Sequence, residues 1–325
     1  MREAEVIERL RRIATAPEAR GLLDDVAVID GFVVTHDSIA EGIHFFPHDP
    51  PASVGWKLVA VNLSDLAAKG AAPAGALLSL TISGLGEWEE AFLGGIEAAC
   101  ESYSLPLVGG DTIALPIGAP RVLGMTLIGR AGEHVPDRAG GQAGDALWLV
   151  GTLGDAAAGL AQLLDEPNAT GPLIDIYRRP IPQLEAGRAL APHAHAMMDV
   201  SDGLLMDARR VSEASGCGIT IELEALPLSS AFVAERGQDH AARLFAATGG
   251  DDYALLAALP ADLDAETLSL PRRTRISRIG TLTDGGAGIS LTHGGKPVEL
   301  PERLGFEHLG DDDRGLSAPP MADRP

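Results

Sequence analysis

Val61-Asn-Leu-Ser-Asp-Leu-Ala-Ala-Lys-Gly-Ala71 is the part of the sequence that says most about the fold. Together with the apolar residues that lead into it, it predicts a helix over 54–69, and Gly70 is a typical residue just past a helix C-terminus. The neighbours of Asp65 are apolar or small, so we expect its carboxyl group to be buried. Because a buried carboxylate needs a partner, Asp65 is the first candidate for a functional residue.

Strands and helices alternate on both sides of this helix. An amphipathic helix opens the chain, with Val6, Ile7, Leu10 and Ile13 on one face. Asp30-Gly31 stands between two apolar runs and is a strong signal for a type I′ hairpin. The other predicted elements of this first α+β unit are strands at 26–29, 32–35, 76–82, 105–108 and 121–129 and a helix over 87–103.

A glycine-rich segment with few apolar residues, 131–144, predicts a domain boundary. We therefore expect three parts: an N-terminal α+β domain over 1–135, a C-terminal α/β domain over 136–310 and a disordered tail over 311–325, which is rich in Asp, Pro and Gly. In the second domain, strands are expected at 146–150, 196–200, 219–223 and 253–259, with helices between them.

The composition argues against several classes of protein. A formal net charge of −21 disfavours nucleic acid as a partner, because a phosphate backbone needs a basic face. The three lysines (Lys57, Lys69 and Lys296) complete no G-x-x-x-x-G-K-[ST] loop, and a Gly-x-Gly-x-x-Gly pattern after a strand is missing too. No run of 18 apolar residues and no signal peptide occur, so we expect no membrane association. Two distant cysteines, Cys100 and Cys217, leave the cytoplasm as the expected compartment.

Acidic residues recur in one setting, beside Gly, Ser or Thr at the end of a predicted strand or on a helix of small residues. They are Asp24-Asp25, Thr35-His36-Asp37, Ser64-Asp65, Gly110-Asp111-Thr112, Asp199-Val200-Ser201-Asp202 and Gly249-Gly250-Asp251-Asp252-Tyr253. Carboxylates brought from several loops suit Mg²⁺, which prefers hard oxygen ligands, and glycine lets the backbone approach a phosphate. Solubility and turn formation are the alternatives for each group alone, and Ser201 can instead cap a helix over 202–215.

In this order the motifs resemble the thiamine-monophosphate kinases, of the superfamily that includes aminoimidazole-ribonucleotide synthetase and selenophosphate synthetase. The resemblance runs from Asp24 to His308 and is most specific at Glu41–Phe45, Val61–Ala71, Leu107–Thr112 and Asp199–Leu204. It implies a two-domain α+β fold like that of aminoimidazole-ribonucleotide synthetase. An N-terminal α+β dimerisation domain would be followed by a C-terminal α/β domain, with the nucleotide between them.

The resemblance also implies roles for individual residues. The metal ligands would be Asp24, Thr35, His36, Asp37, Asp65, Asp111, Asp199 and Asp202. ATP would contact Gly110, Asp111, Arg138 and Ser201, and thiamine monophosphate would contact His44, Asp251 and Phe306. Asp111, Asp202 and Arg138 would carry catalysis. The implied cofactors are ATP and several Mg²⁺ ions, with a K⁺ requirement left open, and the implied assembly is a homodimer. The chain departs from the usual family pattern at Leu23, His36 and Asp251.

These residues predict the transfer of a phosphoryl group from ATP to thiamine monophosphate. Because the acceptor is an anionic phosphate monoester, the reaction needs no strong base, and the main task is to neutralise two polyanions with Mg²⁺ and Arg138. Two alternatives stay open at this stage. One is a member of the superfamily that acts on another small acceptor, and the other is a non-catalytic nucleotide-binding subunit. Selenophosphate synthesis is disfavoured because no cysteine lies near the N-terminal loop.

Overall fold

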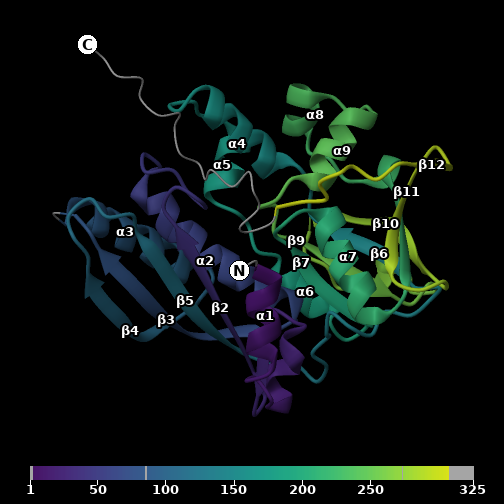
Figure 1. The fold of residues 1–325 in the computed structure, drawn as a ribbon, viewed down its shortest axis with the longest axis horizontal. Helices are drawn as coiled ribbons and strands as arrows, with labels where there is room; N and C mark the ends of the chain where they lie inside the picture. Colours follow the sequence, from purple (N-terminus) through teal and green to yellow (C-terminus); the bar gives the residue numbers. More distant parts are fainter. Residues whose placement is uncertain (1–2, 85, 273, 307–325) are drawn as a thin grey trace.

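A computed structural model of the protein describes residues 3–84, 86–272 and 274–306, arranged around two sheets (Figure 1). The N-terminal sheet has the strand order β1-β2-β5-β3-β4 and is antiparallel except for the β3–β4 pair. Its strands are β1 (Ala27–Ile29), β2 (Phe32–Ala40), β3 (Ala72–Ile82), β4 (Leu107–Ala114) and β5 (Val122–Arg130). The helices of this half are α1 (Glu3–Arg11), the 3₁₀ segment η1 (Pro17–Leu22), α2 (Pro51–Ala68) and α3 (Glu87–Ser102).

The hairpin between β1 and β2 is confirmed, and β2 is longer than the sequence predicts. Asp30 and Gly31 have φ angles of 47° and 79°, the two left-handed positions that a type I′ turn needs. β2 continues to Ala40 because β5 pairs with it along its whole length, from Phe32↔Arg130 to Ala40↔Val122.

The strand at the edge of this sheet is also longer than expected. The sequence predicts a strand that ends at Val108, but β4 runs to Ala114 and includes the Gly109-Gly110-Asp111 motif. Glycine is needed at position 110 because a Cβ atom there would lie 2.1 Å from the Leu78 carbonyl oxygen on β3. Every residue of β4 is exposed.

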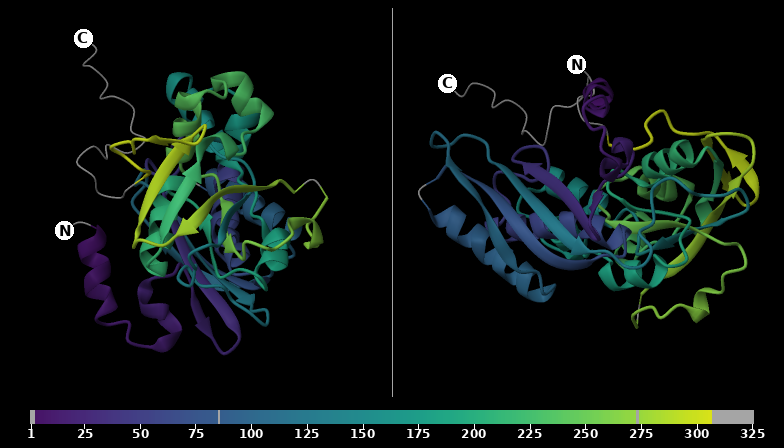
Figure 2. Two further views of the ribbon diagram at one scale, coloured as in Figure 1. Left: turned by 90° about the vertical axis from the view of Figure 1, so that its right-hand side faces the viewer. Right: turned by 90° about the horizontal axis from the view of Figure 1, so that it is seen from below.

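The C-terminal half is built on a seven-stranded sheet in the order β12-β11-β8-β10-β6-β9-β7, antiparallel except for β8–β11. Its strands are β6 (Ala146–Val150), β7 (Ala196–Val200), β8 (Gly218–Glu222), β9 (Ala254–Leu259), β10 (Ile276–Thr283), β11 (Gly288–His293) and β12 (Lys296–Val298). Its helices are α4 (Asp155–Asp165), α5 (Pro172–Arg178), α6 (Leu184–Leu190), α7 (Leu204–Ser215), α8 (Ser230–Arg236) and α9 (His240–Thr248), with 3₁₀ segments η2 (Leu223–Ala225) and η3 (Ala265–Thr267). The predicted combination of helices and sheets in two units is confirmed, and Figure 2 shows the units side by side.

Helix α2 lies between the two sheets and positions the functional residues. Fifteen of its 18 residues are buried, because it packs against β2 and β5 on one side and against β7 and β9 on the other. The predicted helix over 54–69 is confirmed, with a start three residues earlier, and Gly70 has the left-handed φ of 62° expected after a helix end. Asp65, which is on this helix, therefore lies at the junction of the two halves.

The predicted boundary between residues 135 and 136 falls in the segment between β5 and β6, and it stays a prediction. Residues 307–310 and the predicted tail over 311–325 lie outside the described residues. None of the helices in the described part of the chain combines the length and the apolarity that crossing a bilayer requires.

Candidate active site

A cavity of about 750 Å³ at the junction of the two halves collects most of the residues singled out from the sequence. Its wall includes Asp24, Asp25, Asp37, His44, Arg138, Ser201, Asp202, Asp251 and Phe306. These residues come from both halves of the molecule, so the cavity exists only because the two units pack together.

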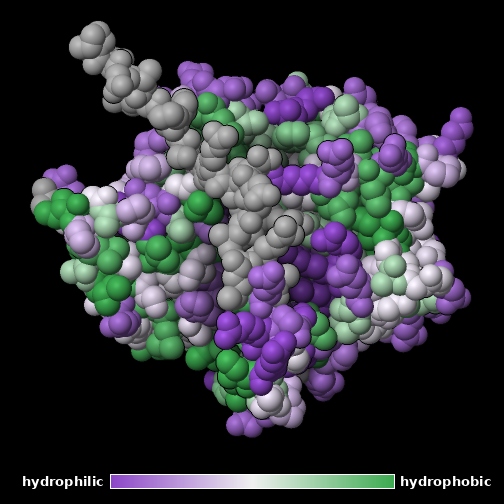
Figure 3. Space-filling model, in the orientation of Figure 1, coloured by the Kyte–Doolittle hydropathy of each residue, from purple (hydrophilic) through white to green (hydrophobic). Residues whose placement is uncertain are grey.

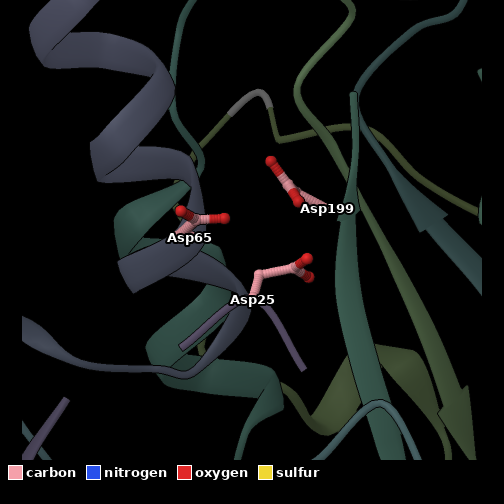
Figure 4. Close-up of side chains that lie close together, drawn as sticks. All are labelled: Asp25, Asp65 and Asp199. Carbon is pink, nitrogen blue, oxygen red and sulfur yellow. The ribbon is translucent and has the colours of Figure 1, made fainter. Parts of the chain in front are cut away.

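Three carboxyl groups meet beside this cavity, and one of them, Asp25, is on its wall. Asp25, Asp65 and Asp199 each offer an oxygen within 4.8 Å of the others. Asp25 precedes β1, Asp65 lies on α2 and Asp199 lies near the end of β7, and Figure 4 shows their side chains pointing toward one another. Only hard oxygen donors are present in this group, which is the donor type that Mg²⁺ prefers.

The electrostatics of this acidic cluster call for a cation. Burial, followed by the charges of neighbouring aspartates, raises the pKa of Asp65 well above its ordinary value and that of Asp199 to about 8. Burial and the charges of Asp25 and Asp202 raise the pKa of Asp37 to about 6. The guanidinium group of Arg138 contacts Asp25, whose pKa is lowered by Arg138 and Lys69 against the opposing effect of burial. A cation bound among these oxygens would remove the cost of charging them.

The two members of the Asp24-Asp25 pair have different surroundings, and the geometry favours Asp25 over Asp24 as a metal ligand. Both oxygens of Asp24 are already engaged: one lies 2.6 Å from Lys69 Nζ and the other 2.7 Å from an Arg20 guanidinium nitrogen. Lys69 is fully buried and also donates to the Met197 carbonyl oxygen of β7. Sequence reasoning recognised the acidic pair but chose Asp24; the buried lysine at the end of α2 is the signal that separates the two.

Alternation along β2 decides which residues of the Thr35-His36-Asp37 motif reach the cluster. The Thr35 hydroxyl donates to Asp65 and also lies 3.3 Å from the Asp25 carbonyl oxygen, and the Asp37 amide donates to Asn62 Oδ1 of α2. The His36 imidazole lies on the opposite face of the sheet, where it hydrogen bonds with Thr126 at 2.8 Å. The geometry therefore leaves only the main chain of His36 for the predicted ligand role.

A second charged group surrounds the turn between β7 and α7. Asp207, at the start of α7, accepts hydrogen bonds from the amides of Ser201 and Asp202, and Arg210 lies 2.6 Å from Asp202 and 2.7 Å from Asp207. Burial raises the pKa of Asp207 to about 7 against the opposing charge of Arg210. The sequence analysis missed Asp207 and Arg210, although their positions one turn apart on the predicted helix could have indicated them. The alternative role of Ser201, as the cap of a helix over 202–215, is wrong, since α7 starts at Leu204 after Gly203.

The residues predicted to bind the acceptor are on the wall of the same cavity. His44 Nδ1 accepts a hydrogen bond from the Ala40 amide, so Nε2 carries the ring proton. Asp251 forms an ion pair with Lys57 at 2.8 Å. The amide of Phe306 donates to the Asp202 carbonyl oxygen, which fixes Phe306 against the cavity wall.

Gly110 and Asp111 lie away from this cavity. Asp111 is in register with Ser79 on β3, Ser79 with Gly124 on β5, and Gly124 with Ser38 on β2. Three strand spacings, about 14 Å, therefore separate Asp111 from Ser38, which is next to Asp37. Within one chain, these two residues do not join the acidic cluster.

Comparison with known proteins places the chain in a family. Residues 23–131 match the family "AIR synthase related protein, N-terminal domain", and residues 142–291 match "AIR synthase related protein, C-terminal domain". The thiamine-monophosphate kinase of Caulobacter vibrioides is 36% identical over 94% of this chain and 90% of its own length, and that of Salmonella typhimurium is 35% identical over 89% and 91%. The chain belongs to the thiamine-monophosphate kinase family. A solved structure, AaThiL complexed with AMPPCP and TMP, matches with a TM-score of 0.82 at 31% identity, covering 94% of this chain and 97% of that one.

The fold extends beyond the thiamine-monophosphate kinases. Hydrogenase maturation protein HypE in complex with ATP matches with a TM-score of 0.66 at 20% identity, covering 90% of this chain and 92% of that one, which shows a shared fold alone. Among the departures from the usual thiamine-monophosphate kinase pattern, two have a structural context. His36 directs its ring away from the acidic cluster, and Asp251 is held by Lys57. Leu23 is 45% exposed beside the acidic pair, and nothing in the structure explains this departure.

Proposed function

We propose that this protein transfers the γ-phosphoryl group of ATP to thiamine monophosphate and forms thiamine diphosphate and ADP. The observation that supports this most is the cavity itself, whose wall brings Asp25 of the carboxyl cluster and two arginines together with His44 and Asp251. The match to AaThiL complexed with AMPPCP and TMP extends over almost the whole chain, and it supports the same pair of ligands here.

Mg²⁺ fits the residues present. Asp25, Asp65 and Asp199 would hold it, with Asp37 and Asp202 on the cavity wall as further oxygen donors. Bound there, Mg²⁺ would neutralise charge on the phosphates of ATP and on the phosphoryl group in transfer. The predicted contributions of Asp24 and Asp111 as ligands are not supported by the geometry within one chain, and a K⁺ requirement stays open.

The protein's own groups neutralise and align the two phosphate-bearing substrates. Arg138 and Arg210 present guanidinium groups to the cavity, and each is already oriented by an aspartate, Asp25 for Arg138 and Asp207 for Arg210. Groups that are fixed before the substrate arrives lose little freedom when charge develops in the transition state. A phosphate oxygen of the acceptor forms the new bond to the γ-phosphorus, the bond to the β,γ-bridging oxygen breaks, and ADP leaves with that electron pair. No general base is required because the attacking oxygen is already anionic.

We also propose a homodimer that covers the edge and open face of the N-terminal sheet. Leu107, Val108 and Ile113 on β4 are 49%, 59% and 52% exposed, and apolar surface lies in this part of the molecule at the left of Figure 3. An exposed apolar edge strand invites pairing or aggregation, so a second copy is the simplest cover. The predicted roles of Gly110 and Asp111 toward the nucleotide then require this second copy. We place the enzyme in the cytoplasm as a prediction.

Product analysis tests the activity. The protein is mixed with ATP, Mg²⁺ and thiamine monophosphate, with thiamine and buffer alone as control acceptors, and the products are separated by chromatography. Thiamine diphosphate formed only from the monophosphate, and only with Mg²⁺, is the expected result. ATP consumption with another phosphate acceptor but not with thiamine monophosphate would instead support a different acceptor. ATP binding without turnover on any acceptor would support a non-catalytic subunit.

A further inference from the structure

Lys57 is a buried cation behind the cavity wall, next to His44 and Asp251, and the proposed mechanism does not use it. It lies on α2, and its side chain is 3% exposed. Its ammonium nitrogen is 2.8 Å from Asp251 Oδ2, 3.1 Å from the His44 carbonyl oxygen and 4.1 Å from the centre of the Tyr177 ring. An ammonium group has three N–H bonds, so these three partners account for all of them.

The three partners of Lys57 line the cavity, whereas Lys57 does not. They come from separate parts of the fold: His44 from the segment between β2 and α2, Tyr177 from α5, and Asp251 from the segment between α9 and β9. The Tyr177 hydroxyl also donates to the His44 carbonyl oxygen at 3.4 Å. One ammonium group outside the cavity therefore contacts three lining residues that come from separate segments of the chain.

Asp251 is held in a fixed orientation by Lys57 together with its neighbours. Its backbone has a φ of 66°, a left-handed conformation that is uncommon outside glycine. Its amide donates to the Ser201 carbonyl oxygen at 2.8 Å, and its second carboxylate oxygen accepts from the Tyr253 hydroxyl at 3.0 Å. Both carboxylate oxygens are thus held, and the side chain remains 28% exposed toward the cavity.

The charge of Lys57 also changes what Asp251 offers to a ligand. An unpaired carboxylate at this position would repel a phosphate monoester that enters the cavity. Paired with Lys57, Asp251 keeps its hydrogen-bonding oxygens but adds little net negative charge. Asp251 therefore does not act as a free counter-charge to the thiazolium ring, as a carboxylate without a partner would.

We propose that Lys57 is a positioning residue for the acceptor, and this rests on the proposed function. It orients His44, Tyr177 and Asp251 and neutralises Asp251 so that a phosphorylated, cationic heterocycle can bind. It acts on the acceptor and not on ATP, because two of its partners, His44 and Asp251, are residues predicted to bind thiamine monophosphate.

The test uses the full-length protein and steady-state kinetics for both substrates. Lys57→Met keeps the length of the side chain and removes its charge. We expect it to raise KM for thiamine monophosphate by about tenfold or more, the scale expected when one member of a buried ion pair is removed. The KM for ATP should stay within about twofold, since none of the residues predicted to contact ATP is a direct partner of Lys57. Lys296→Met, at an exposed lysine of β12, is the matched control and should change neither constant.

A double-mutant cycle separates positioning from simple structural support. Asp251→Asn alone should raise KM for thiamine monophosphate, and Lys57→Met/Asp251→Asn should raise it less than Lys57→Met does, because the double variant leaves no unpaired carboxylate. Independent effects that multiply in the double variant would overturn the proposal. So would equal increases in both KM values, which a general loss of structure produces.

Two other variants test the proposal if Lys57→Met does not fold. If Lys57→Met is unfolded, the double variant and Lys57→Arg carry the test, and both should raise KM for thiamine monophosphate while KM for ATP stays near the wild-type value. Unchanged acceptor KM in a folded variant would overturn the proposal. Wild-type protein that forms no thiamine diphosphate refutes the proposed function, whereas an active wild type with unaffected Lys57 variants refutes this inference alone.

Discussion

Replacing Asp199 by asparagine should change how the stability of the protein depends on pH and on Mg²⁺. Asp199 is 3% exposed on β7, and asparagine has nearly the same shape without the charge. Burial and the charge of Asp25 raise the pKa of Asp199 to about 8 in the folded protein, whereas an aspartate in an unfolded chain has a pKa of about 4.

The sign follows from proton binding. Between those two pKa values the folded state holds a proton on Asp199 that the unfolded state lacks, so the free energy of unfolding falls as pH rises. Each pH unit well below the folded pKa costs about 1.4 kcal/mol for this one group, and the cost flattens near that pKa, so raising the pH from 6 to 8 without Mg²⁺ should cost about 2 kcal/mol. In Asp199→Asn this contribution is absent, so the loss of unfolding free energy between pH 6 and 8 should be smaller by that amount.

Urea unfolding at several pH values, with and without Mg²⁺, measures both effects. Saturating Mg²⁺ should stabilise the wild type by about 3 kcal/mol at 100 times its dissociation constant, and the increase should be lost or greatly reduced in Asp199→Asn. Asp284→Asn, at an exposed residue between β10 and β11, is the control and should behave like the wild type. An Asp199→Asn protein with the pH slope and the Mg²⁺ response of the wild type would refute the reasoning.

Three further predictions follow from other contacts. Asp24→Asn should lower the free energy of unfolding by about 3–5 kcal/mol, because it leaves Lys69 buried without its carboxylate. Urea unfolding measures this change. Unchanged stability together with lost Mg²⁺ binding would show that Asp24 is a metal ligand. Arg138→Ala should reduce kcat by about 10²–10³, the usual effect of removing one group that stabilises transition-state charge; steady-state kinetics would contradict this by showing only a higher KM for ATP. Val108→Asp, on the exposed β4 edge, should give monomers by light scattering if the homodimer forms there, and a dimer that survives the change would move the interface elsewhere.

The sequence predicts the parts of the fold whose signals are local. The I′ hairpin at Asp30-Gly31 and the buried helix that ends before Gly70 depend on turn chemistry and apolar spacing, and both are present. The extension of β2 to Ala40 and of β4 to Ala114 depends on pairing with strands far along the chain, so a pattern of neighbouring residues cannot show it.

The candidate site was predicted by its composition more than by its geometry. Adjacent aspartates look equivalent in a sequence, but a buried lysine engages Asp24 and leaves Asp25 to the cluster. The roles of Lys57 and Arg210 depend on partners that other segments of the chain contribute, so no local motif predicts these roles. Alternation along β2 could have indicated that the His36 side chain faces away from Asp37.

Transfer of label from [γ-³²P]ATP tests the central claim most directly. The protein, in excess over labelled ATP, is mixed with Mg²⁺ and thiamine monophosphate, and the products are resolved over a single turnover. We predict that the label appears in thiamine diphosphate at the rate at which it leaves ATP. Label that appears only as inorganic phosphate, or that stays in ATP while the nucleotide remains bound, would contradict the assignment of this cavity to a thiamine-monophosphate kinase site.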